Sequence, residues 1–406
     1  MFSFTFLRAN ANLIGFGFAL CFVSSVGQTY FISLFGGEIR REFGLSHGEF
    51  GTVYMAGTLA SSATIIWLGR IVDHWSAQRT AWLTLLSLAA VAAFMGLAWG
   101  PLSCAAAIYG LRLMGQGMSV HIGITAMARY FLAERGRALG IAQLGQALGS
   151  ALSPPYVVGL LTLVTWREAW WVTAALVLLL LPLALRLLRN EDLEARTEAL
   201  ARSRGGQSAE GYRVGQMLRD PGLWLRMPVL LAPAFISTGF VFHQVHVAGE
   251  KGWSIELMAA AFSAYAAASV AGLLVGGPLV DRFSARRMVP FYLGPLSLCC
   301  IALAFGNSAW WPPIYLSLMG FGTGVSSVVT GALWPELYGL RYVGAIRAFA
   351  TSTMVFSSGL APMVMGLAFD ASIGVEAVAV ASFSYCMFAS VLASLARPPR
   401  LTADQT

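Results

Sequence analysis

The sequence is poor in charge. Of its 406 residues only 11% are Asp, Glu, Lys or Arg, whereas 57% are hydrophobic; soluble domains carry about 25% charged residues. Because such a small number of charges cannot cover a water-facing surface, most of the surface must face lipid. The net charge of +7 does not indicate a nucleic-acid partner, because the arginines fall in short loops between apolar runs. The composition therefore excludes a soluble protein.

Cysteine and recognisable catalytic motifs are also scarce. The cysteines fall inside apolar runs without metal-ligand spacing, which is typical of small core residues; they are Cys21, Cys104, Cys299, Cys300 and Cys386. The glycines of Gly320-Phe-Gly322-Thr-Gly324 lie in an apolar helix with no preceding strand, which favours close helix packing over a phosphate loop. We therefore expect no metal, no cofactor and no enzyme, and the N-terminus shows no cleaved signal peptide.

Long apolar runs dominate what remains. A spanning helix needs about 20 mostly apolar residues, and the runs predict twelve such helices. They are 9–37, 50–69, two within 80–128 divided at Gly100-Pro101, 138–166, 169–185, 227–249, 257–280, two within 288–335 divided at 307–313, 348–369 and 377–396. The fold class is therefore an all-α membrane protein.

The basic residues predict the orientation. With a cytoplasmic N-terminus, only Arg40, Arg41, Arg167 and Lys251 fall in external loops, and Arg112 falls within the membrane. The other basic residues lie at the inner side, as the positive-inside rule expects. We expect a multi-pass protein of the bacterial inner membrane with both termini in the cytoplasm.

The two halves of the sequence are copies. A shift of 208 residues aligns the loop 69–79 with the loop 277–287, and six of these eleven positions are identical. The same shift pairs further residues along the halves: Gly44 with Gly252, Ser46 with Ser254, Gly136 with Gly344, Ser150 with Ser358, Pro154 with Pro362, and Glu168 with Glu376. Parallel six-helix repeats are typical of carriers with a mid-membrane site. The predicted domains are 1–188, a polar linker 189–221, and 222–406.

The repeated loops resemble a signature of the major facilitator superfamily, Gly-x-x-x-Asp-(Arg/Lys)-x-Gly-x-(Arg/Lys)-(Arg/Lys). The second copy has Ser284 where glycine is usual, and the first has His74 where a basic residue is usual. Arg112-Leu-Met-Gly115-Gln-Gly117 is similar to the family's motif on helix 4. The resemblance implies two pseudo-symmetric bundles of six helices that work by alternating access.

A finer resemblance is to the monocarboxylate and oxalate/formate carrier group. It rests on the run 130–140, on His243-Gln-Val-His246 and on the run 337–346. The group usually has an anion-binding Arg on helix 8, or a Lys on helix 1 or 11, and neither is present. The group's substrate therefore does not transfer directly.

Arg112 is the charge that the sequence places deepest in the membrane. A mid-bilayer arginine costs about 2.5–3.5 kcal/mol even on insertion scales, so it should face the protein interior or a watery cavity. All acidic residues fall in loops, in the linker or at helix ends, which favours an anionic or neutral substrate over a cation. Arg112 either contacts the substrate or holds carbonyls of helix 1.

Polar side chains at helical spacing are the other candidates for substrate binding: Gln28, Tyr30, Gln116, Gln143 and Gln146. Such groups also form ordinary interhelical hydrogen bonds. His243 and His246 are candidates for proton coupling because histidine titrates near physiological pH, and the alternative is a hydrogen-bonded pair near a helix end.

The two repeated loops predict the inner gate. By resemblance, their Asp pairs with a neighbouring helix end and an Arg, and this contact breaks when the halves move. The residues involved are Asp73, Arg79, Asp281, Arg282, Arg286 and Arg287. The alternative is a loop that only sets topology.

The sequence thus favours a monomeric, proton-coupled symporter of a small organic anion such as a monocarboxylate. Its partners are the small-molecule substrate, protons and the lipid bilayer. The first alternative is a proton-coupled exporter or antiporter of a neutral or amphiphilic compound. A membrane sensor with a transporter fold is a third possibility and would bind without flux.

Overall fold

The computed structural model describes residues 8, 10–69, 71–131, 135–187, 211–339, 341–397 and 399, with the side chains of residues 73, 74, 135 and 183–185 left out. All the regular elements in this part are helices, and Gly211 and Gly339 form an isolated bridge. The chain divides into two compact units. Unit 1 is Met1–Gly206 with Val241–Val245, and unit 2 is Gln207–Phe240 with His246–Thr406.

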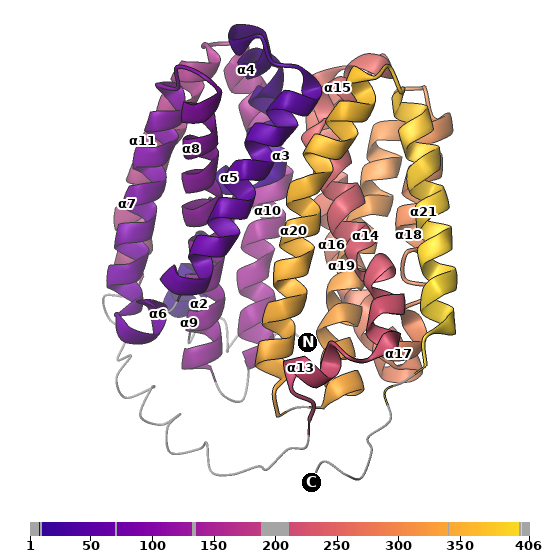
Figure 1. Cartoon of the computed structure of the whole chain (residues 1–406). Helices are drawn as coiled ribbons and strands as arrows, with labels where there is room; N and C mark the ends of the chain where they lie inside the picture. Colours follow the sequence, from indigo (N-terminus) through magenta and orange to yellow (C-terminus); the bar gives the residue numbers. More distant parts are fainter. Residues whose placement is uncertain are drawn as a thin grey trace. The chain divides into compact units, whose positions relative to one another are not determined.

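Unit 1 contains six helical rods, several of them interrupted. In Figure 1, α7 and α11 run side by side along this unit. The elements in chain order are α2 (Ala11–Val23), η1 (Ser24–Gly27), α3 (Thr29–Ile32), η2 (Ser33–Phe35), α4 (Gly36–Phe43), α5 (His47–Leu68), α6 (Ile71–His74), α7 (Ala77–Gly96), α8 (Pro101–Leu111), the π-helical η3 (Arg112–Ser119), α9 (Val120–Tyr130), α10 (Arg135–Leu161) and α11 (Trp166–Arg186).

Unit 2 repeats this order with longer, more regular helices. Its α16 packs along α19, and α18 along α21 (Figure 1). The elements are α13 (Val214–Met217), α14 (Pro221–Phe242), α15 (Gln244–Glu250), α16 (Ile255–Phe283), α17 (Ala285–Met288), α18 (Gly294–Phe305), α19 (Trp311–Tyr338), α20 (Val343–Asp370) and α21 (Val375–Leu395). The last residues of α14 belong to unit 1.

Among the described residues, six helices are individually long and apolar enough to cross a membrane: α7, α14, α16, α19, α20 and α21. The bent pair formed by Ala11–Gly27 and Thr29–Phe43 makes a seventh, with a bend of 44°. The all-α architecture of two repeated six-helix bundles agrees with the fold class expected from the sequence.

The repeat seen in the sequence is also present in the backbone. Gly44 and Gly252, which end equivalent helices, have φ values of 64° and 67°, a conformation that costs glycine little. Ser46 and Ser254 both cap the next helix by accepting a hydrogen bond from the backbone N–H three residues on. All five cysteines are buried and free, as expected of core residues.

Three expected spans differ from the structure, and the expected linker is described only at its end. The first expected span, 9–37, is broken at η1, and the seventh, 227–249, is broken at His243. The fourth widens into a π-helix from Arg112 instead of continuing as a regular α-helix. Most of the linker expected at 189–221 lies outside the described residues; its end contains the short helix α13.

Candidate functional site

The first helix of unit 1 breaks where a charged side chain reaches it. After η1, Gln28 is extended, with φ −84° and ψ 155°, and α3 begins at Thr29. An extended residue inside a helix releases the carbonyl groups before it from their usual intrahelical partners. Irregular backbone at membrane depth is tolerated only where it is buried in protein or lines a polar cavity. The break therefore marks a place where polar groups gather.

Arg112 is the charged side chain at this break. It begins η3 and is only 4% exposed. Its Nη1 lies 3.4 Å from the Gly27 carbonyl oxygen and 3.5 Å from Thr29 Oγ1, at the long end of the hydrogen-bond range. Its guanidinium carbon lies 5.4 Å from the centre of the Tyr54 ring. Arg112 therefore does contact helix 1, but weakly.

Two glycines bring η1 and η3 into backbone contact. A Cβ on Gly27 would collide with the Leu111 carbonyl and lie 2.6 Å from the Gln116 backbone nitrogen. A Cβ on Gly115 would lie 2.7 Å from the Gly27 Cα. Because only glycine permits this approach, these two residues set the distance between Arg112 and the helix break.

Two buried hydrogen-bond donors at this site lack partners within the described part of the chain. They are Nε of Arg112 and Nε2 of Gln28, which is 7% exposed. None of the described ion pairs includes Arg112. A buried donor without an acceptor costs about 1–3 kcal/mol, so its presence calls for an explanation. An oxygen-bearing ligand that reached these donors would supply one.

Tyr54 and Thr29 complete the immediate surroundings of Arg112. The Tyr54 hydroxyl and Thr29 Oγ1 are 2.7 Å apart, and the Tyr54 ring lies 4.6 Å from the ring of Phe242. Neither residue was singled out in the sequence, because a lone tyrosine or threonine in an apolar helix carries no distinctive signal. They connect Arg112 to the segment Val241–Val245, which belongs to unit 1.

That segment is held by specific hydrogen bonds. Gln244 Nε2 donates to Ser33 Oγ over 2.8 Å and to the Tyr30 carbonyl over 3.1 Å. Ser33 Oγ donates to the Val241 carbonyl over 3.1 Å. Ser33 and Val241 are one repeat apart, 208 residues, so equivalent positions of the two copies meet here. Phe242 stacks on Phe50 at 5.2 Å.

The remaining candidates for substrate binding are dispersed. The Tyr30 hydroxyl donates to Ser25 Oγ over 3.1 Å, so it is already used within unit 1. Gln116 is half-buried on η3, whereas on α10 Gln143 is exposed and Gln146 is half-buried. No described contact joins Gln143 or Gln146 to Arg112. The structure thus places Gln28 between the two residues that contact Arg112, Gly27 and Thr29, and shows no such link for the α10 amides.

The two histidines have different surroundings. His243 is 4% exposed at the break after α14, with its ring 5.0 Å from Phe242 and 5.7 Å from His47. His246 lies in α15 with Nε2 3.2 Å from Glu250 Oε2, and its ring is 4.5 Å from that of Phe369. His246 thus lies beside a carboxylate, whereas His243 lies among aromatic rings.

The residues expected at the inner gate are mostly exposed. The side chain of Asp73 lies outside the described part. Arg79 stacks over Trp75 at 4.3 Å. Asp281, Arg282, Arg286 and Arg287 are exposed, and none of the described ion pairs includes Asp281. Instead, Glu336 Oε2 of α19 accepts hydrogen bonds from the backbone N–H groups of Ala285 and Arg286, at 2.9 and 3.4 Å.

Comparison with known proteins supports the fold. The chain is 28% identical over 272 residues to the transcription regulatory protein OpdE of Pseudomonas aeruginosa, a match that spans 64% of this chain and 62% of that protein's length. Among solved structures it is similar to a bacterial homolog of the human lysosomal transporter Spinster. The inward-facing, occupied form has a TM-score of 0.67 at 16% identity over 96% of both chains. The unoccupied form has a TM-score of 0.69 at 15% identity over 95% of this chain and 96% of that one. The sequence model of the Major Facilitator Superfamily matches residues 17–245 and 232–406, so the chain belongs to this superfamily of membrane transporters.

Proposed function

We propose that the chain is a secondary transporter that moves a small organic anion, of monocarboxylate type, by alternating access and in symport with protons. The observation that carries this proposal is the pair of unpaired buried donors, Arg112 Nε and Gln28 Nε2. A carboxylate has two acceptor oxygens and a negative charge, so it can accept from a guanidinium and an amide at once. Charge-assisted hydrogen bonds of this kind are about twice as strong as neutral ones.

Arg112 has the chemistry of a substrate contact because its present contacts are long. A guanidinium already satisfied by the protein would gain little from a ligand. Here Nη1 has acceptors only at 3.4 and 3.5 Å, and the neighbouring Tyr54 supplies a ring face without a negative charge. A ligand carboxylate would replace these weak contacts with strong ones. Because the site is buried at low dielectric, a cationic substrate beside the guanidinium is disfavoured.

Proton coupling in this proposal is assigned to His243 or His246. His243 is buried beside Phe242, whose ring touches Tyr54, the residue next to Arg112. The positive charge of a proton on His243 would therefore act close to the bound anion. His246 has Glu250 as its counter-charge. The orientation in the bacterial inner membrane, cytoplasmic termini and monomeric state belong to the same proposal.

The deciding experiment uses purified full-length protein in proteoliposomes with acetate, lactate and pyruvate, and with lactamide as an uncharged counterpart. We expect an inward proton gradient to drive lactate accumulation and lactamide to neither bind nor move. Arg112→Gln should weaken lactate binding by about 30-fold or more, since losing one partner of a buried charged contact costs about 2–5 kcal/mol. Arg41→Gln, at an exposed arginine paired with Glu38, is the matched control.

The structural alternative for Arg112 gives a different result. If Arg112 only ties η3 to helix 1, Arg112→Gln should lower the melting temperature of the ligand-free protein and leave lactate affinity unchanged. The substrate proposal expects an unchanged melting temperature and a weaker lactate affinity, because Nη1 bonds only weakly to helix 1 in the absence of a ligand. Equal binding of lactate and lactamide would refute the anion assignment and favour the exporter of neutral compounds.

For the inner gate, we propose that Asp281 acts with Arg282, Arg286 and Arg287, and Asp73 with Arg79. Asp281→Asn is expected to slow lactate turnover several-fold with little change in affinity, because an exposed loop contributes to the transition and not to the site. Uptake rates and equilibrium binding measured on the same preparation separate the two. A loss confined to affinity would contradict the gate.

A sensor is the second candidate, favoured by the name of the Pseudomonas relative. A sensor with this fold would bind a ligand and show no flux. The proteoliposome assay decides directly, since binding without accumulation in either direction would replace the transporter proposal by this one.

A further inference from the structure

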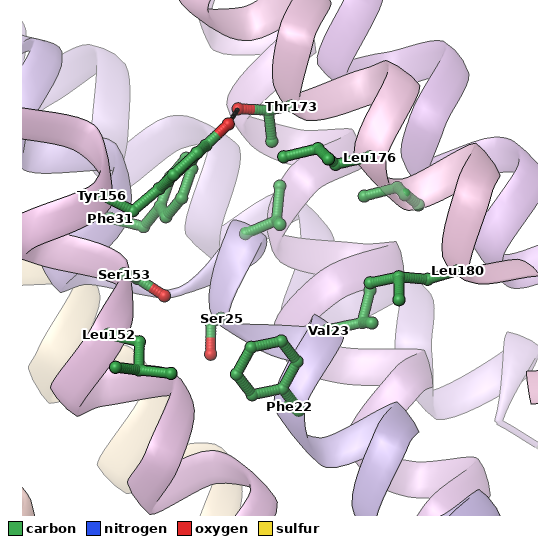
Figure 2. Close-up of a pocket in the computed structure, with 12 residues that line it drawn as sticks. Phe22, Val23, Ser25, Phe31, Leu152, Ser153, Tyr156, Thr173, Leu176 and Leu180 are labelled. Atoms are coloured by element: carbon green, nitrogen blue, oxygen red, sulfur yellow. Dashed lines mark hydrogen bonds between the residues drawn. The ribbon is translucent and has the colours of Figure 1, made fainter. Parts of the chain in front are cut away.

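Unit 1 contains a pocket away from Arg112, of about 240 Å³. Its walls come from α10 and α11, and its floor from the end of α2 and from η1 (Figure 2). Phe22, Val23 and Val26, which we call the floor residues, line the pocket from α2 and η1, and Leu152 and Leu176 line it from α10 and α11. All of its lining residues lie in unit 1, and they were not singled out in the sequence.

The pocket is lined by uncharged residues, and the hydroxyl groups of Tyr156, Thr173 and Ser25 are already engaged. The Tyr156 hydroxyl lies 3.3 Å from Thr173 Oγ1 (Figure 2), and Thr173 in turn donates to the Ala169 carbonyl. Ser25 Oγ accepts from the Tyr30 hydroxyl. What remains for a ligand is apolar surface, and a charged or strongly polar molecule would lose its hydration here without compensation.

The mouth of the pocket lies between exposed apolar residues of α10 and α11. Leu152 and Leu176 on its rim are 51% and 41% exposed. Beyond the rim, Leu148 on α10 and Leu179 on α11 are also exposed. Exposed leucines on neighbouring turns form an apolar patch of the kind that membranes contact. The acyl chains of the bilayer therefore have the chemistry to enter this mouth.

We infer that this pocket binds the acyl chain of a membrane lipid and that the bound chain supports the break at η1. Val23, Ser25 and Val26 line the pocket, whereas Gly27 of the same turn packs on η3 and its carbonyl faces Arg112. The lipid pocket and Arg112 thus lie on opposite sides of η1. An acyl chain fills the space into which the turn would otherwise relax, and keeps the Gly27 carbonyl beside Arg112.

The acyl-chain site is independent of the transported substrate, because none of its lining residues belongs to the proposed anion site. Water is a poor occupant, since apolar cavities of this kind stay dry. A free amphiphile such as a detergent would use the same apolar surface, and the experiment is therefore performed in a bilayer with a defined lipid.

The test uses full-length protein in nanodiscs containing phosphatidylcholine with a diazirine halfway along one acyl chain. After irradiation, peptide mass spectrometry locates the adducts. We expect adducts on the floor residues Val23 and Val26, which are 5% and 9% exposed and are reached only through the pocket. Adducts confined to exposed residues such as Leu148 and Leu179 would overturn the site.

A variant that fills the pocket provides the control. Ser153→Phe places a ring inside it and should reduce floor adducts by roughly tenfold, the loss expected when about two methylene groups can no longer be buried. Leu148→Phe adds a ring on the same helix outside the pocket and should leave floor adducts unchanged. If Ser153→Phe does not fold, Ser153→Leu serves the same purpose. Equal floor labelling in the filled and control variants would refute the proposal.

The link to η1 has its own readout. In delipidated wild-type protein, adding dioleoyl phosphatidylcholine should slow hydrogen exchange at the amides of Ser24–Gln28 severalfold, and Ser153→Phe should show slow exchange before any lipid is added. If the exchange rate at η1 changes neither with added lipid nor with Ser153→Phe, the acyl chain does not support the break, even if it binds in the pocket.

Discussion

The fourth helix of unit 1 and its counterpart in unit 2, α19, occupy equivalent sequence positions, but the first buries a charged residue and the second buries a glycine. Arg112 is paired by the 208-residue shift with Gly320. In unit 1 the helix widens into η3 around the buried guanidinium. In unit 2, α19 is continuous from Trp311 to Tyr338, and Gly320 and Gly324 lie directly against the carbonyl groups of Tyr265 and Ser269 on α16.

This difference distinguishes the residues that serve helix packing from those that form the candidate site. Small residues let helices approach closely where packing is the only requirement, and α19 shows this arrangement over several turns. Unit 1 uses the same device, for example where Gly145 lies against the Phe18 carbonyl, but at Gly27 and Gly115 it brings a helix break and a charge together. The repeat shows what the fold needs, and the departures from it show where this chain has added polar chemistry.

The largest effect is expected at Gly320. Gly320→Ala would place a Cβ against the Tyr265 backbone, which cannot move aside as a flexible side chain can, and should destabilise the protein by about 3 kcal/mol. Gly331→Ala is the control on the same helix, because no atom lies within 4 Å of its added Cβ, and it should stabilise by about 0.5–1 kcal/mol. Thermal unfolding in detergent measures both. A tolerated Gly320→Ala would show that α16 and α19 can separate at little cost.

A second comparison concerns two equivalent junctions of helix ends. In unit 1, Arg167 donates to the Gly96 carbonyl over 3.0 Å and pairs with Glu42. In unit 2, Lys251, the only lysine of the sequence, donates over 3.4 Å to the carbonyl of Ala304, the counterpart of Gly96, and pairs with Glu376 over 2.8 Å. The counterpart of Arg167 is Val375, whose backbone N–H donates to Glu250, the counterpart of Glu42. The junction is kept while its cation comes from another helix.

Burial should make the two cations unequal. The side chain of Lys251 is 2% exposed and that of Arg167 is 27% exposed. We expect Lys251→Met to lower the free energy of unfolding by about 2–3 kcal/mol, because the buried Ala304 carbonyl loses its donor and Glu376 loses its ion-pair partner. Arg167→Met should cost about 1 kcal/mol, as for partly exposed ion pairs. Melting temperatures at low and high salt test this, since only the loss caused by Arg167→Met should become smaller at high salt. Equal losses would remove the distinction.

The sequence predicted features that depend on neighbours along the chain. The repeat offset placed Ser46 with Ser254 and Gly44 with Gly252, and both pairs have matching backbone roles. The depth of Arg112 followed from the apolar run around it, and its burial confirms that it faces the protein interior. Local pattern was sufficient in these cases because each feature is set within one helix.

Features set by distant contacts were missed. The break at η1 depends on Gly27 meeting Gly115, and only the Ser24-Ser25-Val26-Gly27 run hinted at a kink. The break at His243 has no glycine or proline in Val241–Val245; it accompanies contacts of Phe242 and Gln244 with residues some 200 positions away. Gln143 was selected for its polarity, but polarity does not say which face of α10 it occupies.

The smallest effect concerns the motif loops, where identical serines adopt different conformations. Ser76 has φ −62° and accepts a hydrogen bond from the Arg79 N–H, whereas its counterpart Ser284 has φ 67° and ψ 147°, a region that costs residues other than glycine about 1–3 kcal/mol. This conformation explains why glycine is usual there. In unit 2 the cap comes from Glu336 instead. Ser284→Gly should therefore stabilise by about 1 kcal/mol after the entropy cost of glycine, while Ser76→Gly should cost a few tenths of a kcal/mol. Opposite shifts in melting temperature for the same substitution would establish the asymmetry, and shifts of the same sign would mean that the two loops share one conformation.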